Sequence, residues 1–389
     1  MTRPPNGPAP TRVAVIRHGP FFSDPRVAKE ALALAEQPGV TVEAFVRGPD
    51  VAPWASHPRL TVRALDDARP ADRPVRLAVQ AVRFGLRVRR LLARSRPRFD
   101  VVIVHSIPSW LALMLFPAGG RPRPRLILDH HEPEVEMVRE AGLPPPMTMV
   151  TRAVESLSIR AADGVVDVSP EMATRSAELG ARRQFVVDNA PAILVPSATG
   201  APRPSLDLAV FGSLIERYDL PTLRESLALM GEPVDVRQIG RGPAWLPDNP
   251  SGGRLVWTEF LPLPELQATL RDCRFGFVGL NPSAFTDLVS PNRLFELAGL
   301  EIPAVVARTT ITTRLLGPFA LYYQGGSSRS LRDALRTALR MSEGDRRRMG
   351  DGARRRLAGR SWEAQYDGFV EFCLDRPVTN GGAGSAWSA

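Results

Sequence analysis

The sequence contains little cysteine, little lysine and few aromatic residues, and each shortage narrows the class of protein. Cys273 and Cys373 are the only cysteines among 389 residues, and they form neither a disulfide framework nor a zinc motif. We therefore expect a protein of the reducing cytoplasm. Lys29 is the only lysine, so arginine carries nearly all of the positive charge. The chain is 44% hydrophobic and 7% aromatic, as is typical of a globular protein.

Long apolar runs are also missing. The longest, Trp110 to Ala118, is about half of the roughly 18 residues that a membrane span needs. The first residues have no apolar stretch of the signal-peptide type, so we expect no secretion by that route. The formal net charge of +9 favours anionic partners. A basic patch with interleaved aromatic residues is absent, however, and no nucleic-acid partner is predicted.

Strands and helices alternate in two successive parts of the chain. Compact apolar runs such as Val13–Ile16 and Val101–Val104 are typical of strands buried in a parallel sheet. The fold class is therefore α/β, with two facing Rossmann-like domains and an interdomain cleft as the default ligand site. The predicted boundaries are a disordered tail at 1–10, an N-terminal domain at 11–190, a linker at 191–205, a C-terminal domain at 206–358, a helix at 359–378 that returns to the N-terminal domain, and a disordered tail at 379–389. The glycine fingerprint of NAD-binding domains is absent after the first strand.

The segment from Ser290 to Ala307 is the strongest candidate for a binding site. Pro291 is typical of the first turn of a helix, and Pro303 to Ala307 are typical of a buried strand. The free N–H groups at a helix start bind anions such as phosphate. Glu296, one turn further in, would project beside such an anion, where α/β proteins often hold ribose hydroxyls. The alternative is an ordinary amphipathic helix whose Glu296 is solvated.

A second candidate site follows the apolar run Leu126–Leu128, which leads into Asp129, two histidines and Glu132. Residues at the carboxyl ends of parallel strands face the ligand crevice, which makes His131 and Glu132 candidates for catalysis. A zinc site is the rival interpretation. Because the remaining histidines form no motif that would supply further ligands, no metal is expected.

These segments resemble the nucleotide-sugar glycosyltransferases of the GT-B fold, in the large retaining family 4. Pro291–Glu296 is similar to the Pro-Asn-Lys-Leu-Phe-Glu segment of that family, and His131 matches the histidine of its Asp-Ala-His-Glu strand end. Segments near Ser169 and Ala190 are similar as well. The resemblance extends from residue 11 to about residue 375. It implies transfer of a sugar from a nucleoside diphosphate sugar, UDP or GDP, with retention and without a metal or other cofactor.

The resemblance also implies the residues of the site. Glu296 would bind the ribose, the backbone at Arg293 and Leu294 would meet the diphosphate, and His131 would lie near the sugar. The implied residues for nucleotide-sugar binding are Gly212, Ser213, Arg217, Gly240, Arg241, Gly242, Asn292, Arg293, Leu294 and Glu296. The candidates for catalysis are His131 and Glu132, and those on the acceptor side are His18, Arg26 and His105. A two-carboxylate hydrolase that uses Glu132 and Glu296 is the alternative chemistry.

The sequence departs from the family pattern at three positions. Leu288 stands where the family often has a glutamate that touches sugar hydroxyls. Ser213 and Tyr218 stand where the family has an arginine and a lysine for the diphosphate, and Arg217 is one residue away. Arginine binds phosphate well, so Arg217 is the expected replacement. Without it, donor binding would depend on the helix start alone, and a non-catalytic GT-B partner subunit becomes an alternative.

The motifs leave the acceptor open. The arginine-rich composition favours a small-molecule acceptor in bacterial specialised metabolism, such as antibiotic biosynthesis. The helix expected at Arg76–Arg94 has arginines on one face and apolar residues on another. Such a helix could lie on an anionic membrane, which would favour a lipid-linked or cell-surface acceptor and a peripheral position at the inner membrane face. A core-packing helix with a charged outer face is the alternative.

Overall fold

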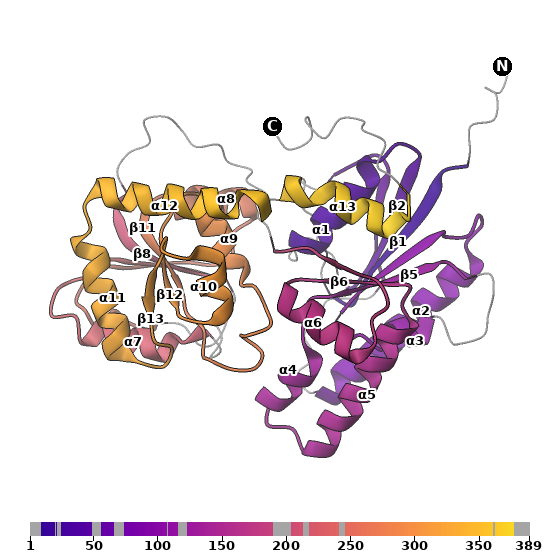
Figure 1. Ribbon diagram of the computed structural model, residues 1–389, viewed down its shortest axis with the longest axis horizontal. Coiled ribbons are helices and arrows are strands. Elements are labelled where there is room, and N and C mark those ends of the chain that lie inside the picture. The colour runs from indigo at the N-terminus through magenta and orange to yellow at the C-terminus, as the bar shows by residue number, and fades with distance from the viewer. Residues whose placement is uncertain are drawn as a thin grey trace. The chain divides into compact units, whose positions relative to one another are not determined.

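The computed structural model describes residues 9–19, 21, 25–48, 56–65, 74–106, 108–115, 123–189, 204–212, 218–240, 246–360 and 362–376. Within these ranges the chain divides into two compact units, each with its own sheet (Figure 1). The first comprises the described residues up to Val187 and those from Tyr366 onward, and the second those from Asp188 to Gln365. The predicted α/β fold with two Rossmann-like domains is confirmed. The predicted linker and the two predicted tails fall almost entirely outside the described residues.

The first unit is built on a seven-stranded parallel sheet in the order β3-β2-β1-β4-β5-β6-β7. Its strands are β1 (Thr11–Arg17), β2 (Val40–Val46), β3 (Leu60–Ala64), β4 (Val101–His105), β5 (Arg125–His130), β6 (Gly164–Asp167) and β7 (Gln184–Val186). The apolar run Val13–Ile16 is fully buried, because helices cover both faces of a parallel sheet. The strand order reverses between β1 and β4, and ligands of such sheets bind at the carboxyl ends of the strands at this point.

The helices of the first unit form a layer on each side of this sheet. They are α1 (Pro25–Glu36), α2 (Pro74–Arg94), α3 (Leu111–Leu115), α4 (Glu134–Glu140), α5 (Pro145–Ala161), α6 (Pro170–Leu179) and, from Tyr366 onward, α13 (Trp362–Leu374). Buried side chains of α2, α3, α5 and α6 share one core with the sheet. On the other side, the Tyr366 hydroxyl of α13 donates to the carbonyl of Ala33 in α1 at 2.7 Å, and the Phe372 ring stacks on Phe185.

The second unit is built on a six-stranded parallel sheet in the order β10-β9-β8-β11-β12-β13. Its strands are β8 (Leu206–Phe211), β9 (Val236–Ile239), β10 (Leu255–Thr258), β11 (Cys273–Val278), β12 (Ala304–Ala307) and β13 (Leu321–Tyr323). Its helices are α7 (Leu220–Ala228), α8 (Leu263–Leu270), α9 (Asn292–Gly299), α10 (Thr310–Leu316), α11 (Ser328–Arg340) and α12 (Glu343–Leu357), followed by a 3-10 turn at Ala358–Arg360. Ala209 and Phe211 of β8 enter the core under α8, α9, α10 and α12, whereas Leu208 and Val210 enter the core under α7 and α11. The order reverses between β8 and β11, which marks the second candidate crevice.

Candidate active site

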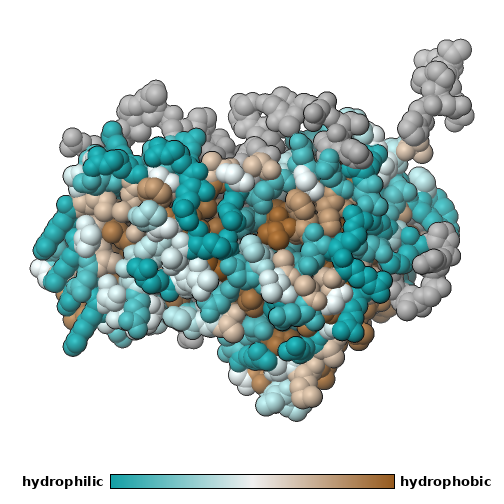
Figure 2. All heavy atoms as spheres, in the orientation of Figure 1, coloured by the Kyte–Doolittle hydropathy of each residue, from teal (hydrophilic) through white to brown (hydrophobic). Residues whose placement is uncertain are grey.

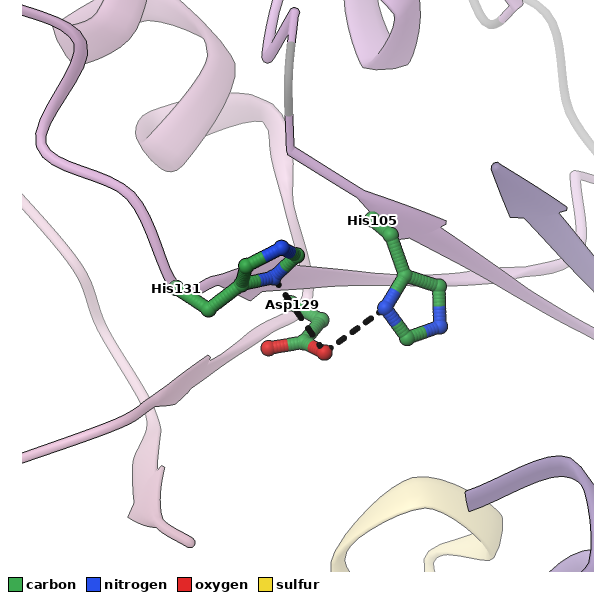
Figure 3. Close-up of side chains that lie close together, drawn as sticks. All are labelled: His105, Asp129 and His131. Carbon is green, nitrogen blue, oxygen red and sulfur yellow. Dashed lines mark ion pairs between the residues drawn. The ribbon is translucent and has the colours of Figure 1, made fainter. Parts of the chain in front are cut away.

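A buried polar cluster lies at the carboxyl ends of the central strands of the first unit (Figure 3). His105 is the last residue of β4, Asp129 lies near the end of β5, and His131 follows that strand. One oxygen of Asp129 lies 2.7 Å from Nδ1 of His105 and 3.6 Å from Nδ1 of His131. His105 and Asp129 are completely buried and His131 is 8% exposed. The prediction that His131 lies at a strand end in the crevice region is therefore consistent with this geometry.

Arg26 on α1 fixes the charge of this cluster. Its Nε and one Nη donate to the two oxygens of Asp129 at 2.9 and 3.0 Å, and its other Nη donates to the carbonyl of Val187 at 2.8 Å. Burial alone would raise the pKa of Asp129, but Arg26, together with His105 and His131, holds that pKa well below its usual range. Burial lowers the pKa of His105, although Asp129 partly opposes that effect. Asp129 is therefore a buried carboxylate that remains ionised.

Arg17 and Ser106 contact His131 from two neighbouring strand ends. An Nη of Arg17, the last residue of β1, lies 3.3 Å from Nε2 of His131. Because a guanidinium can only donate, Nε2 of His131 is the acceptor in this contact. The backbone N–H of His131 donates to the Ser106 hydroxyl at 3.3 Å. Arg17 thus contacts the imidazole at Nε2, and Ser106 positions the backbone of the same residue.

The sequence also predicts roles for four other residues of this unit. Arg26 and His105, predicted on the acceptor side, are both buried around Asp129. His18 is half-buried, with its ring edge against Phe84. Glu132 is half-buried immediately after His131. Their predicted roles toward substrate stay predictions.

Two histidines and a carboxylate also raise the question of a metal. The ligand atoms of His105, Asp129 and His131 lie within 4.8 Å of one another, and imidazole and carboxylate are common ligands of divalent cations. However, Arg26 binds both oxygens of Asp129, and Arg17 contacts Nε2 of His131. A second positive charge would have to compete with both guanidinium groups. The surroundings therefore fit a charged hydrogen-bond network better than a metal centre.

Two glycines meet at the carboxyl ends of β8 and β9 in the second unit. Gly212 follows β8 with φ 94°, and Gly240 follows β9 with φ 141°. A Cβ at Gly240 would lie 2.0 Å from the carbonyl oxygen of Gly212. Both backbones therefore require glycine, for conformation and for space. The predicted residues Ser213, Arg217, Arg241 and Gly242 lie outside the described residues.

Helix α9 supplies the remaining predicted residues. It begins at Asn292, after Pro291, with no side-chain cap bond at Pro291 and no acidic residue in its first turn. Asn292 is exposed, whereas Leu294 is 1% exposed and belongs to the core, and its backbone N–H donates to the carbonyl of Pro291 at 3.1 Å. Glu296 is half-buried, and Gln267 of α8 donates to its carboxylate at 3.2 Å. The carboxylate is therefore oriented by a neighbouring helix.

Sequence reasoning missed three residues that shape these sites: Asp129, Arg17 and Gln267. A signal for Asp129 was present, because side chains two residues apart on a strand share a face. Asp129 and His131 accordingly lie together, while His130 points into a separate buried network. Arg17 and Gln267 belong to other elements and left no such signal.

Solved structures share this architecture. Sucrose-phosphate synthase from Thermosynechococcus elongatus is 14% identical with a TM-score of 0.73, over 93% of this chain and 98% of that chain. The N-terminal domain of Candida albicans trehalose-6-phosphate phosphatase is 11% identical with a TM-score of 0.66, over 96% and 99% of the two chains. HepE from Anabaena, solved with UDP and glucose, is 14% identical with a TM-score of 0.64, over 94% and 98%. At these identities the likeness concerns the fold alone, and it defines the chain as a protein of the GT-B fold.

The family follows from the sequence of the first unit. Residues 24–190 match the family model of the glycosyl transferase 4-like domain. No curated protein matches the chain significantly. This part of the chain belongs to the glycosyl transferase 4-like family, and the protein is a nucleotide-sugar-dependent glycosyltransferase, as the resemblance in its motifs predicted.

Proposed function

We propose that the protein transfers a sugar from a UDP or GDP sugar, with retention, and that the second unit binds the nucleotide. The observation that carries this proposal is the arrangement at α9. A helix start without acidic residues provides N–H groups for the diphosphate, and Glu296 lies one turn further along the same helix. Gln267 holds the Glu296 carboxylate in a fixed orientation, which suits it to accept hydrogen bonds from ribose hydroxyls. The complexes of HepE with UDP and with UDP-glucose support a UDP sugar as the first donor to test.

In the first unit, we assign His131 to contacts with the transferred sugar. Arg17 contacts Nε2 of the ring and Asp129 lies 3.6 Å from its Nδ1, so that an incoming hydroxyl meets a preorganised group. Glu132 is the second candidate beside it. Charge develops on the departing diphosphate as the glycosidic bond breaks, and groups that bind this diphosphate therefore supply the main catalytic effect. We assign no covalent residue.

A thermal-shift screen against UDP, GDP, TDP, ADP and CMP tests the donor, because a ligand that binds only the folded state raises the melting temperature. We expect a clear shift with UDP or GDP. Glu296→Ala should then weaken binding by about 1.5–3 kcal/mol, roughly 10- to 100-fold, through the loss of a charge-assisted hydrogen bond. Glu265→Ala, which removes an exposed carboxylate from α8, is the matched control and should bind normally. A protein that binds none of the five nucleotides would instead fit a non-catalytic GT-B subunit.

For the acceptor, the surface of the first unit favours a lipid-linked molecule over the small-molecule acceptor that composition suggested. Helix α2 contains six arginines and no acidic residue, yet Val79, Val82 and Leu86 are each more than 40% exposed. Helix α3 contacts both α2 and α5, and α5 exposes Met149 and Val150. Hydrophobic side chains lie among hydrophilic ones near the end of the α4 and α5 pair (Figure 2). Apolar side chains among arginines are typical of helices that lie on anionic membranes.

Sedimentation with vesicles tests this choice. Among the described residues, none of the helices combines the length and the hydrophobicity of a membrane span. We expect binding to vesicles of anionic phospholipid at low salt, loss of binding at high salt, and no binding to neutral vesicles. Replacement of Arg83 and Arg90 by glutamate should abolish it. If the wild-type protein fails to sediment at low salt, the small-molecule acceptor of specialised metabolism becomes the better proposal.

A further inference from the structure

A buried guanidinium lies beside the glycine turn of the second unit. Arg293, in the first turn of α9, is 9% exposed. A Cβ placed on Gly212 would lie 2.8 Å from Nε of Arg293 and 3.2 Å from one of its Nη atoms. The guanidinium therefore packs directly against the turn that follows β8. This turn lies where the strand order reverses, which is where parallel α/β sheets bind ligands.

Tyr218 sets the plane of this guanidinium. The central carbon of the Arg293 guanidinium lies 3.7 Å from the centre of the Tyr218 ring. Such stacking engages the flat face of a guanidinium, whereas phosphate oxygens are bound at its edge. The ring of Tyr218 therefore contacts the face of the guanidinium and not the edge that carries its N–H groups.

The Tyr218 backbone is itself anchored on two sides. Its carbonyl oxygen would lie 2.2 Å from a Cβ at Gly279, so it packs tightly against the residue that follows β11. The next residue, Asp219, is 2% exposed and adopts a left-handed conformation with φ 56°. Its carboxylate accepts from the Tyr323 hydroxyl at 2.8 Å and from the Gly326 N–H at 3.1 Å. Tyr218 is therefore a fixed platform for Arg293.

We propose that the side chain of Arg293, held in position by Tyr218, binds the diphosphate of the donor nucleotide. The inference rests on the proposed nucleotide site of the second unit and names the cation that completes it. The sequence favours Arg217 as the replacement for the missing phosphate-binding residues, and the family resemblance implies that the backbone at Arg293 meets the diphosphate. In the present assignment Arg293 is the phosphate ligand, acting beside the N–H groups of α9, and Tyr218 is a positioning residue.

The test separates phosphate binding from general damage by comparing each nucleotide with its own nucleoside. Calorimetry would measure UDP against uridine and GDP against guanosine, for the wild-type protein and for Arg293→Gln, Tyr218→Leu and Tyr218→Phe. We expect Arg293→Gln to weaken binding of the diphosphate roughly 10- to 100-fold and to leave nucleoside binding unchanged. Tyr218→Leu should weaken the diphosphate in the same sense and by less, and Tyr218→Phe, which keeps the ring, should bind as the wild-type protein does.

Arg274→Gln is the matched control. Arg274 lies on β11 near its amino end, where it pairs with Asp207 at 3.2 Å, and its loss changes the net charge equally. It should bind UDP and GDP normally. Equal diphosphate affinity in Arg293→Gln and the wild type would overturn this inference alone, and so would equal losses for nucleotide and nucleoside. Absence of any nucleotide binding by the wild-type protein would overturn both this inference and the proposed function.

Discussion

His130 is predicted to make the stability of the first unit depend on pH. It lies at the end of β5, completely buried, with Nε2 2.8 Å from a Glu155 oxygen and Nδ1 3.0 Å from the Ser176 hydroxyl. Burial alone would lower its pKa, but hydrogen bonds with Asp167 and Glu155 raise that pKa to about 9. In the unfolded chain the pKa is about 6.5.

The difference of about 2.5 pKa units corresponds to roughly 3 kcal/mol of unfolding free energy. Because the folded state has the higher pKa, this contribution is fully present below pH 6.5 and is lost as the pH rises through 9. Glu155 has a low pKa, about 2, because of its contacts with His130 and Arg175. The free energy of the contact between His130 and Glu155 is therefore counted only once.

Urea unfolding of the wild-type protein and of His130→Gln at pH 6.5 and pH 9.5 measures this effect. The gap in unfolding free energy between the two proteins should shrink by about 3 kcal/mol from the lower to the higher pH, since all other titrating groups cancel in the comparison. Burial lowers the pKa of His57, so His57→Gln is the control, and its gap should change by no more than about 0.4 kcal/mol over this range. An identical gap for His130→Gln at both pH values would refute the reasoning.

Two further changes have defined outcomes. Burial raises the pKa of Glu134 to about 7, so the stability that its protonated form contributes is present below about pH 4.5 and lost as the pH rises through 7. Glu134→Gln should therefore melt higher than the wild type at pH 8 but not at pH 4.5, and a constant difference would contradict this. Gly240→Ala should cost roughly 1–3 kcal/mol and weaken nucleotide binding, because its Cβ would collide with the neighbouring glycine turn. Gly252→Ala, also at positive φ but in open space, is the control, and equal losses in both variants would refute a role for the collision.

The strands could be predicted from sequence because both faces of each sheet are covered, which leaves apolar runs such as Val101–Val104. Helix α12 could not be predicted from its sequence. Its sequence is very polar, and Gly350 and Gly352 lower its helical propensity. In the structure a Cβ at Gly350 would lie 2.0 Å from the carbonyl oxygen of Glu301, and one at Gly352 would lie 2.2 Å from the ring of Phe319. Close packing therefore selects these glycines, and that requirement is visible only in the folded chain.

The candidate site of the first unit could be predicted only in part, because only some of its features are local properties of the sequence. His131 was identified because it follows a strand, which is a local property of the sequence. The charge state of the cluster depends on Arg26, which reaches Asp129 from α1, far away along the chain. The sequence contains many arginines, and nothing in it distinguishes Arg26 as the one that contacts Asp129. Local patterns thus locate the ends of strands, whereas the electrostatics of the site come from the tertiary fold.

The second unit shows the same limit of prediction from local sequence patterns. Sequence comparison finds a serine and a tyrosine where phosphate-binding cations are expected, and by itself this suggests a weakened site. In the structure the guanidinium of Arg293 lies over the ring of Tyr218, and this contact gives Tyr218 a positioning role in the proposed site. A lysine at 293 would carry the same charge but no flat face to stack on the ring. In the proposed site the tyrosine and the arginine therefore act as a pair, and the departure from the family pattern at 218 is interpreted together with the residue at 293.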